Sequence, residues 1–154
     1  MKLPKYPLAS DDDFTAFEFV SEGPKGLVYK LIQFTPTNLK GLYNLAFGDK
    51  NISTGGINDL VVTNNGDSEK VLATVAAAVY AFTDKYPNAW VYATGSTKSR
   101  TRLYQIGISK YLKEAEQDFE ILAELKDDWE TYKENRNYEG FMIRRRVKNK
   151  DRLK

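Results

Sequence analysis

The segment from Ser68 to Tyr86, SEKVLATVAAAVYAFTDKY, constrains the fold because its large apolar residues recur at the spacing of an α-helix. These residues are Leu72, Val75, Val79, Phe82 and Tyr86. Alanines occupy much of the remaining surface, so the helix is slim and suits close packing on a sheet. Asp67 is the expected N-cap, and Pro87 ends the helix. The rest of the chain must therefore supply a sheet for this helix to cover.

Segments on both sides of this helix have the composition of strands, with breaks at Gly, Pro and Asn. Strands are predicted at 14–20, 27–34, 42–47, 57–62, 89–93, 119–125 and 141–147, and a second helix at 98–116. The segment 89–93 is apolar almost throughout, which indicates a central strand. Residues 126–139 are predicted to be a polar connection that includes a helical turn.

The predicted fold is α+β, in the order β-β-β-β-α-β-α-β-β. It has a mainly antiparallel twisted sheet of about six to seven strands, with two main helices on one face. Residues 1–147 are expected to form a single domain, and residues 148–154 a basic, disordered tail.

The composition excludes several classes of chemistry. The chain has no Cys and no His, which rules out disulfides, thiolate catalysis and imidazole acid–base catalysis within it. We expect no cofactor and no bound metal. The most apolar stretch, VLATVAAAVYAF, is about half a membrane span, and the N-terminal residues lack the apolar centre of a signal peptide. We therefore expect a cytoplasmic protein without a membrane segment.

Charge is unevenly distributed along the chain, although the net charge is only +2. Residues 94–113 hold five bases and no acid, residues 114–139 hold ten acids and three bases, and residues 144–154 hold seven bases and one acid. One interpretation is a surface whose charges pair with each other. The alternative is an anionic partner, such as nucleic acid, that contacts both basic segments.

The stretch TGSTKSRTRLY, residues 94–104, carries the main candidate site. It follows a predicted central strand and opens the second helix, whose N-terminal N–H groups favour anions. The candidate anion ligands are Ser96, Thr97, Lys98, Arg100 and Arg102. A P-loop is excluded, because no Gly stands directly before Lys98. The alternative is a helix capped by Ser96 or Thr97, with its bases solvated. A separate hypothesis has Arg100, on the same face as Tyr104, pointing inward to a carboxylate.

Three aspartates at predicted strand ends or caps form a second, supporting set: Asp49, Asp59 and Asp67. Their spacing matches no known metal loop, so turn and cap chemistry is the favoured explanation. A further hypothesis pairs Asp49 or Asp59 with Arg100 or Arg102. That pair would join the N-terminal sheet to the second helix.

The segment FMIRRRV and the tail after it form a third candidate region. Strand alternation places Arg144 and Arg146 on one face and Arg145 on the other. Nearby aromatic residues are candidates for stacking on nucleic acid bases: Trp129, Tyr132, Tyr138 and Phe141. The alternative is an edge strand protected by its charges.

Several segments together resemble a family of uncharacterised bacterial proteins: FEFVSEGPKG (17–26), NLAFGD (44–49), NNGD (64–67), GSTKSRTRLY (95–104) and NYEGFMIRR (137–145). The resemblance spans most of the chain. It implies one compact domain and emphasises the same motifs, but it implies no substrate and no catalytic residue.

The leading functional hypothesis is a small binding domain with an anion site at the start of the second helix. The expected ligand is nucleic acid, a nucleotide or an acidic protein segment. One alternative is an enzyme, a His-free ribonuclease like those among small bacterial toxins, in which Tyr104, Arg100 and Arg102 stabilise a phosphoryl transition state. Another is a subunit whose acidic segment, residues 114–139, binds a basic partner. The sequence leaves the ligand and the oligomeric state open.

Overall fold

The computed structural model of the chain describes residues 4–58, 63–95, 98–134 and 136–146. In this described part, eight strands form one sheet in the order β1-β2-β3-β4-β5-β8-β6-β7. The strands are β1 (Ala9–Ser10), β2 (Ala16–Gly23), β3 (Gly26–Pro36), β4 (Leu42–Asp49), β5 (Trp90–Ala93), β6 (Phe119–Leu125), β7 (Asp128–Thr131) and β8 (Gly140–Arg145). The helices are α1 (Ser68–Lys85), α2 (Lys98–Lys110) and α3 (Leu112–Asp118). The predicted α+β class is confirmed.

Strands β2 and β3 form the predicted hairpin, with Gly23 paired to Gly26 at its tip. Gly26 has a φ of +86°, which most side chains disfavour. Gly23 has a different constraint, because a Cβ there would lie 2.1 Å from the carbonyl oxygen of Asn65. The hairpin tip is therefore in direct contact with the NNGD segment that leads into α1.

Strands β4 and β5 are the parallel pair of an otherwise antiparallel sheet, and α1 connects them. Helix α1 buries Val75, Val79 and Phe82 as its periodicity predicts, while Leu72 and Tyr86 of the same predicted face are partly exposed. The Phe82 ring stacks on Phe34 of β3 with centroids 4.2 Å apart. Strand β5 lies in the interior of the sheet, as its apolar composition indicates.

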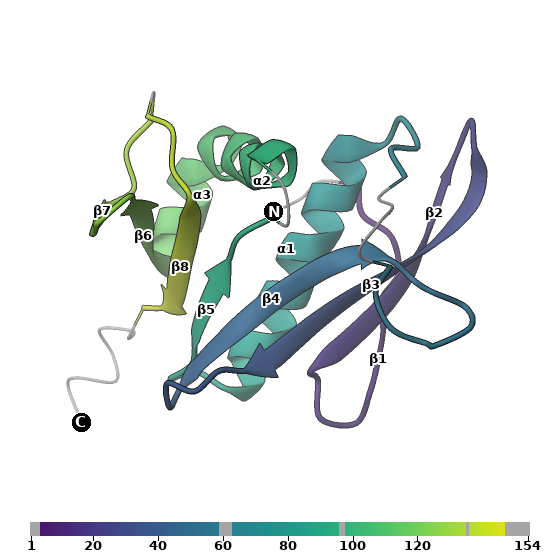
Figure 1. Cartoon of the computed structure of the whole chain (residues 1–154), viewed down its shortest axis with the longest axis horizontal. Coiled ribbons are helices and arrows are strands. Elements are labelled where there is room, and N and C mark those ends of the chain that lie inside the picture. Colours follow the sequence, from purple (N-terminus) through teal and green to yellow (C-terminus); the bar gives the residue numbers. More distant parts are fainter. Residues whose placement is uncertain (1–3, 59–62, 96–97, 135, 147–154) are drawn as a thin grey trace.

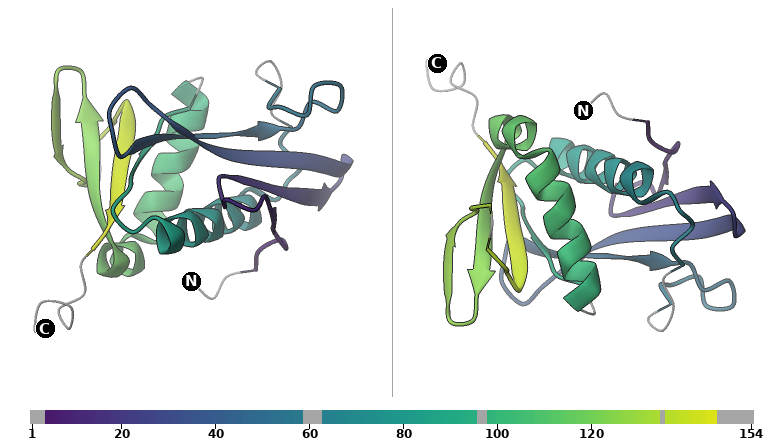
Figure 2. Two further views of the ribbon diagram at one scale, coloured as in Figure 1. Left: turned by 90° about the horizontal axis from the view of Figure 1, so that it is seen from below. Right: turned by 90° about the horizontal axis from the view of Figure 1, so that it is seen from above.

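The described helices cover one face of the twisted sheet, with α1 over its middle and α2 and α3 toward β6 and β8 (Figures 1 and 2). Buried side chains on that face come from both ends of the sheet, including Ile32, Val91, Ile121 and Phe141. The expectation of helices on one face is met. None of the helices in the described ranges has the length and apolar character needed to cross a membrane.

Two features of the C-terminal half differ from the prediction. The predicted helix 98–116 is two helices, and a new turn begins where Ala115 N–H donates to the Tyr111 carbonyl at 2.9 Å. The chain changes direction between α2 and α3 (Figure 1), and Tyr104 of α2 and Phe119 of β6 are both buried. Residues 128–131 form edge strand β7 instead of a helical turn. Its residues are mostly exposed, so it has no apolar alternation to reveal it.

The N-terminal part also differs in detail. Strand β1, two exposed residues paired with β2, was not predicted. Of the predicted strand 57–62, residues 59–62 lie outside the described residues, and Ile57 makes an isolated bridge to Lys50. The predicted tail 148–154 also lies outside the described residues.

Candidate functional site

The candidate site lies at the carboxyl ends of the parallel strands β4 and β5, where the chain enters α1 and α2. This end of a parallel strand pair is where α/β proteins commonly bind ligands. Two groups of polar residues are found there. One is a buried network before α1, and the other is the first turns of α2.

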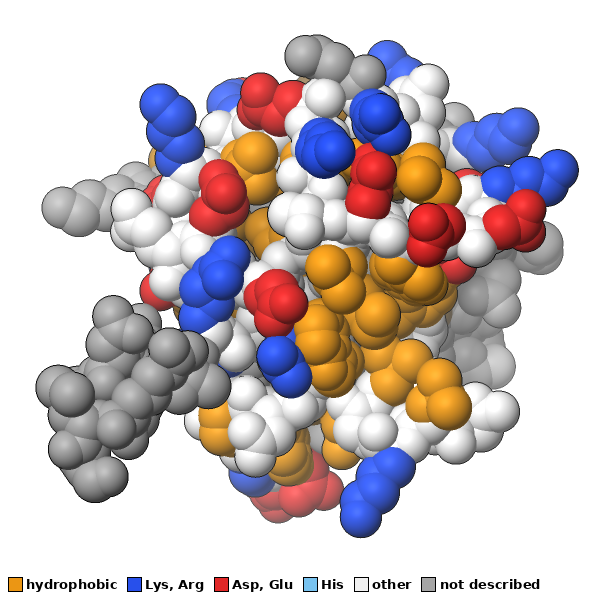
Figure 3. All heavy atoms as spheres, turned by 90° about the vertical axis from the view of Figure 1, so that its left-hand side faces the viewer, with side chains coloured by type: hydrophobic (Ala, Val, Ile, Leu, Met, Phe, Trp, Pro, Cys, Tyr) orange, Lys and Arg blue, Asp and Glu red, His pale blue; other side chains and the backbone are white. Residues whose placement is uncertain are grey.

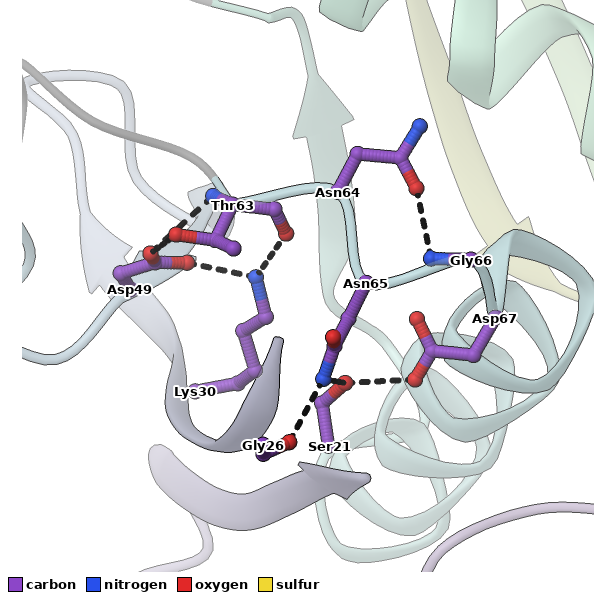
Figure 4. Close-up of polar contacts among 9 residues, drawn as sticks. All are labelled: Ser21, Gly26, Lys30, Asp49, Thr63, Asn64, Asn65, Gly66 and Asp67. Carbon is purple, nitrogen blue, oxygen red and sulfur yellow. Dashed lines mark hydrogen bonds and ion pairs between the residues drawn. The ribbon is translucent and has the colours of Figure 1, made fainter. Parts of the chain in front are cut away.

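The buried network begins with an ion pair between Lys30 of β3 and Asp49 of β4, which are register partners (Figure 4). Lys30 Nζ donates to Asp49 Oδ1 at 2.5 Å and to the Thr63 carbonyl at 2.7 Å. Asp49 Oδ2 accepts hydrogen bonds from Thr63 N–H at 3.0 Å and Thr63 Oγ1 at 2.6 Å. A buried charge pair needs such additional hydrogen bonds to offset its desolvation. The pair thus anchors the segment before α1 to the sheet.

Asn65 continues the network, and its side chain is almost completely buried. Its Nδ2 donates to the Gly26 carbonyl at 2.9 Å and to Ser21 Oγ at 3.3 Å. Its Oδ1 accepts from Lys25 N–H at 2.7 Å. Asn65 therefore provides hydrogen-bond partners for a backbone N–H and a backbone carbonyl of the β2–β3 turn. These bonds explain why the turn lies so close to Asn65.

Asp67 occupies the N-cap position of α1, but its side chain makes no capping hydrogen bond. Its Oδ2 instead accepts from Ser21 Oγ at 2.5 Å and from the Tyr6 hydroxyl at 2.6 Å. The predicted N-cap position of Asp67 is confirmed, but two buried hydroxyls bind its carboxylate in place of the helix N–H groups. Burial, followed by the hydrogen bond to Asp67, raises the pKa of Tyr6.

The start of α2 carries exposed positive charge. Lys98 and Arg102 are both exposed, and the first turn of the helix has no acidic residue. Thr101 of the same turn is buried, and its Oγ1 accepts from Gly95 N–H at 2.9 Å. The hydrogen bond ties the end of β5 to α2. Ser96, Thr97 and the side chain of Arg100 lie outside what the structure describes.

Of the predicted candidates, the structure therefore brings together Lys98 and Arg102, one helical turn apart. Asp49 and Asp67 belong to the buried network, and Asp59 lies outside the described residues. Asp49 pairs with Lys30, not with Arg102. Tyr104 is 8% exposed and lines an apolar cavity. No group of three acidic side chains suited to a metal ion occurs in the described part of the chain.

The C-terminal arginines on β8 are engaged within the protein. Arg144 pairs with Glu120 at 3.1 Å and stacks over the Trp90 ring at 4.4 Å. Arg145 extends to the opposite face, toward α1, and pairs with Asp84 at 2.6 Å. The predicted alternation of these two side chains is confirmed. The interpretation of 141–147 as an edge strand is wrong, because β8 lies between β5 and β6.

The aromatic residues near β8 are mostly unavailable for stacking on bases. Tyr132, Tyr138 and Phe141 pack against one another in the core. Trp129 of β7 is 37% exposed, and its ring packs edge-on against Tyr92. On this side of the molecule, hydrophobic side chains gather beside a surface of mixed charge (Figure 3).

Five members of the network were not predicted from the sequence: Tyr6, Ser21, Lys30, Thr63 and Asn65. Lys30 had a usable signal. It alternates with Ile32 and Phe34 on the inward face of a strand, where an unpaired lysine is rare. A buried lysine at this position indicates a carboxylate partner on the next strand.

These features define an α+β protein with one mainly antiparallel sheet, helices on one face and a polar network at its single described parallel strand pair. The chain belongs to the family of unknown function DUF6934, whose family model matches residues 2–146. This confirms the resemblance to an uncharacterised family. No curated protein and no solved structure matches the chain.

Proposed function

We propose that this chain is a cytoplasmic binding domain for a phosphate-bearing ligand, which it contacts at the start of α2. The observation that carries the proposal is the pair Lys98 and Arg102, exposed together at the N-terminus of a helix that follows a parallel strand. Phosphate groups favour both the helix N-terminus and forked contacts from arginine.

The electrostatics of the first turns of α2 support a function in binding rather than in stability. Positive charge is unfavourable near the positive end of a helix dipole. Like charges four residues apart on one helix face also repel each other. Lys98 and Arg102 combine both penalties, with no acidic residue in the first turn to offset them. A bound anion would relieve both.

The buried network supports the same site indirectly. It uses Asp49 and Asp67 inside the protein, so these carboxylates are not presented to a ligand. It also fixes residues 63–67 against the β2–β3 hairpin. The entry to α1 is thereby tied to the sheet, and pre-ordered backbone near a site reduces the entropic cost of binding.

The two alternative functions gain less support from the described residues. For the ribonuclease, Tyr104 is buried in an apolar environment while Arg102 is exposed, so the two side chains do not converge. For a subunit that binds a basic partner, several acids are already engaged. Glu120 pairs with Arg144, Glu124 accepts from the Tyr92 hydroxyl, and Glu130 accepts from the Tyr138 hydroxyl.

The test is a titration of the protein with short RNA, short DNA, a nucleoside triphosphate and inorganic phosphate, each at low and high salt. We expect binding that weakens as salt rises. The variants Lys98→Gln and Arg102→Gln are expected to bind several-fold more weakly and with a shallower salt dependence.

The matched control is Lys126→Gln, which removes an exposed lysine in the β6–β7 turn. It is expected to bind like the wild type. Comparison of the four ligands distinguishes nucleic acid from a free phosphate compound. The proposal is overturned by absence of binding at low salt, or by equal losses in all three variants.

A further inference from the structure

A cavity of about 130 Å³ lies between the helices and the sheet, apart from the phosphate site. Its lining is almost entirely apolar and includes Leu72, Ala76, Tyr104, Ile108, Ile121 and Phe141. Protein interiors contain few voids larger than a water molecule. A void of about 150 Å³ lined by apolar side chains is large enough to bind benzene. This cavity therefore has room for one small ring.

The cavity is closed below by the sheet and partly open between the helices. Its floor is made by mostly buried side chains of β4, β5, β6 and β8, such as Leu45 and Ala93. Its walls on α1 and α2–α3 include residues of intermediate exposure, such as Ala76 and Ala115. A small molecule can thus reach the cavity from the helix side.

Close packing of α1 against α2 limits the cavity at Gly107. A Cβ at Gly107 would lie 3.2 Å from Leu72 Cδ1, so the two helices are in contact there. Elsewhere, Ala76 and Ala115 are too small to fill the gap between helices and sheet. At the end of α2, Lys110 binds Glu69 of α1, and its ammonium group lies 5.7 Å from the centre of the Tyr111 ring. The cavity therefore exists because the lining residues Ala76 and Ala115 are small. The ion pair between α1 and α2 lies beside Tyr111.

Tyr111 gives the lining an unused hydrogen-bond donor. It lines the cavity, and its hydroxyl is buried without a hydrogen-bond partner among the described residues. Leaving a buried hydroxyl unpaired is costly. A water molecule is a poor partner, because a buried water needs two to four polar contacts and the cavity lining is almost entirely apolar. A ligand that is apolar except for one acceptor fits this environment better.

We propose that the cavity binds a small, uncharged, lipophilic carbonyl compound, about the size of one six-membered ring. The ring fills the apolar space, and the carbonyl oxygen accepts a hydrogen bond from the Tyr111 hydroxyl. This site is independent of the phosphate site, because it lies on the buried side of α2 while Lys98 and Arg102 are exposed.

The experiment follows binding of two probes, benzene and cyclohexanone, by the chemical shifts of backbone amides around Gly107 and Ala115. Wild-type protein is expected to bind both, with cyclohexanone held more tightly. Tyr111→Phe keeps the shape of the cavity and removes the donor. It is expected to lose about five-fold in affinity for cyclohexanone, the effect of one hydrogen bond, with benzene affinity unchanged.

Ala76→Leu fills the space with a larger apolar side chain and is expected to abolish binding of both probes. Its folding is checked by the dispersion of the same amide spectrum. Failure of wild-type protein to bind either probe overturns the proposal. Equal cyclohexanone affinity in wild type and Tyr111→Phe also overturns it, because the hydroxyl then has no part in binding. Neither result depends on phosphate binding.

Discussion

Lys30 and Asp49 are register partners on β3 and β4, and their side chains form an ion pair on the helix-covered side of the sheet. The Lys30 side chain is only 2% exposed, and its ammonium group also binds the carbonyl of Thr63. An ion pair so deeply buried stabilises a fold only while both partners are present. It ties the segment before α1 to two adjacent strands, and Lys30 on one of them is 33 residues from Thr63 in sequence.

The first prediction concerns the loss of stability when one partner of this ion pair is replaced. Lys30→Met leaves the Asp49 carboxylate buried without its cation, and we expect a loss of about 3–5 kcal/mol in the free energy of unfolding. Urea unfolding followed by circular dichroism measures it. The control is Glu18→Gln, which removes the exposed pair with Lys50 and is expected to cost less than about 1 kcal/mol. Similar losses in both variants would contradict the prediction.

Gly23→Ala is the second prediction. The new methyl group would meet the Asn65 carbonyl oxygen at 2.1 Å, and Asn65 is fixed by its own hydrogen bonds. Because one of the two backbones must move, we expect a loss of roughly 1–3 kcal/mol in the free energy of unfolding. Gly56→Ala is a matched control, since its Cβ would find only Thr54 Oγ1 at 3.7 Å. The same urea experiment should show little change for this variant.

Stability at alkaline pH is the third prediction. Burial, followed by the hydrogen bond to Glu124, raises the pKa of Tyr92 to about 12. The folded pKa is higher than the unfolded value of about 10, so folding favours the neutral phenol. The stabilisation is complete below about pH 10 and is lost as pH rises toward 12. Tyr92→Phe should show a smaller decrease in stability over this window.

Thermal unfolding at several alkaline pH values measures the effect, with the phenolate absorbance of folded protein as a second readout. Tyr29→Phe is the control, because this tyrosine is 51% exposed on β3. This variant should lose stability with rising pH as steeply as the wild type. A Tyr92→Phe protein that loses stability as steeply as wild type would refute the assignment.

The sequence was sufficient to predict those helices and strands in which the apolar pattern agrees with the burial of the side chains. Helix α1 presents one apolar face and buries it, so periodicity identified it. The β2–β3 hairpin follows from glycines that the turn requires. Strand β7 was missed because it is a short edge strand with exposed residues. The break between α2 and α3 was missed because the apolar spacing continues across Tyr111 and the change of direction depends on where the sheet lies.

The candidate site was harder to predict from the sequence than the fold. Asp49 and Asp67 were predicted as acids at turns from the local sequence. Their partners are distant in sequence: Lys30 for Asp49, and Ser21 and Tyr6 for Asp67. Tertiary contacts alone bring these groups together. In the sequence, Arg144 and Arg145 have the pattern of a basic surface. Their carboxylate partners on β6 and α1 lie 24 and 61 residues away along the chain.

The last prediction concerns the cost of the positive charge at the start of α2. Lys98 lies in the first turn, near the positive end of the helix dipole and one turn from Arg102. Lys98→Gln is therefore expected to raise the free energy of unfolding by about 0.3–1 kcal/mol at low ionic strength. Salt screens exposed charges, so the difference from wild type should shrink as ionic strength rises. Lys126→Gln, in the β6–β7 turn, should leave stability unchanged at both salt concentrations. Thermal unfolding of the three proteins provides the comparison, and a loss of stability in Lys98→Gln would mean that the lysine supports the fold.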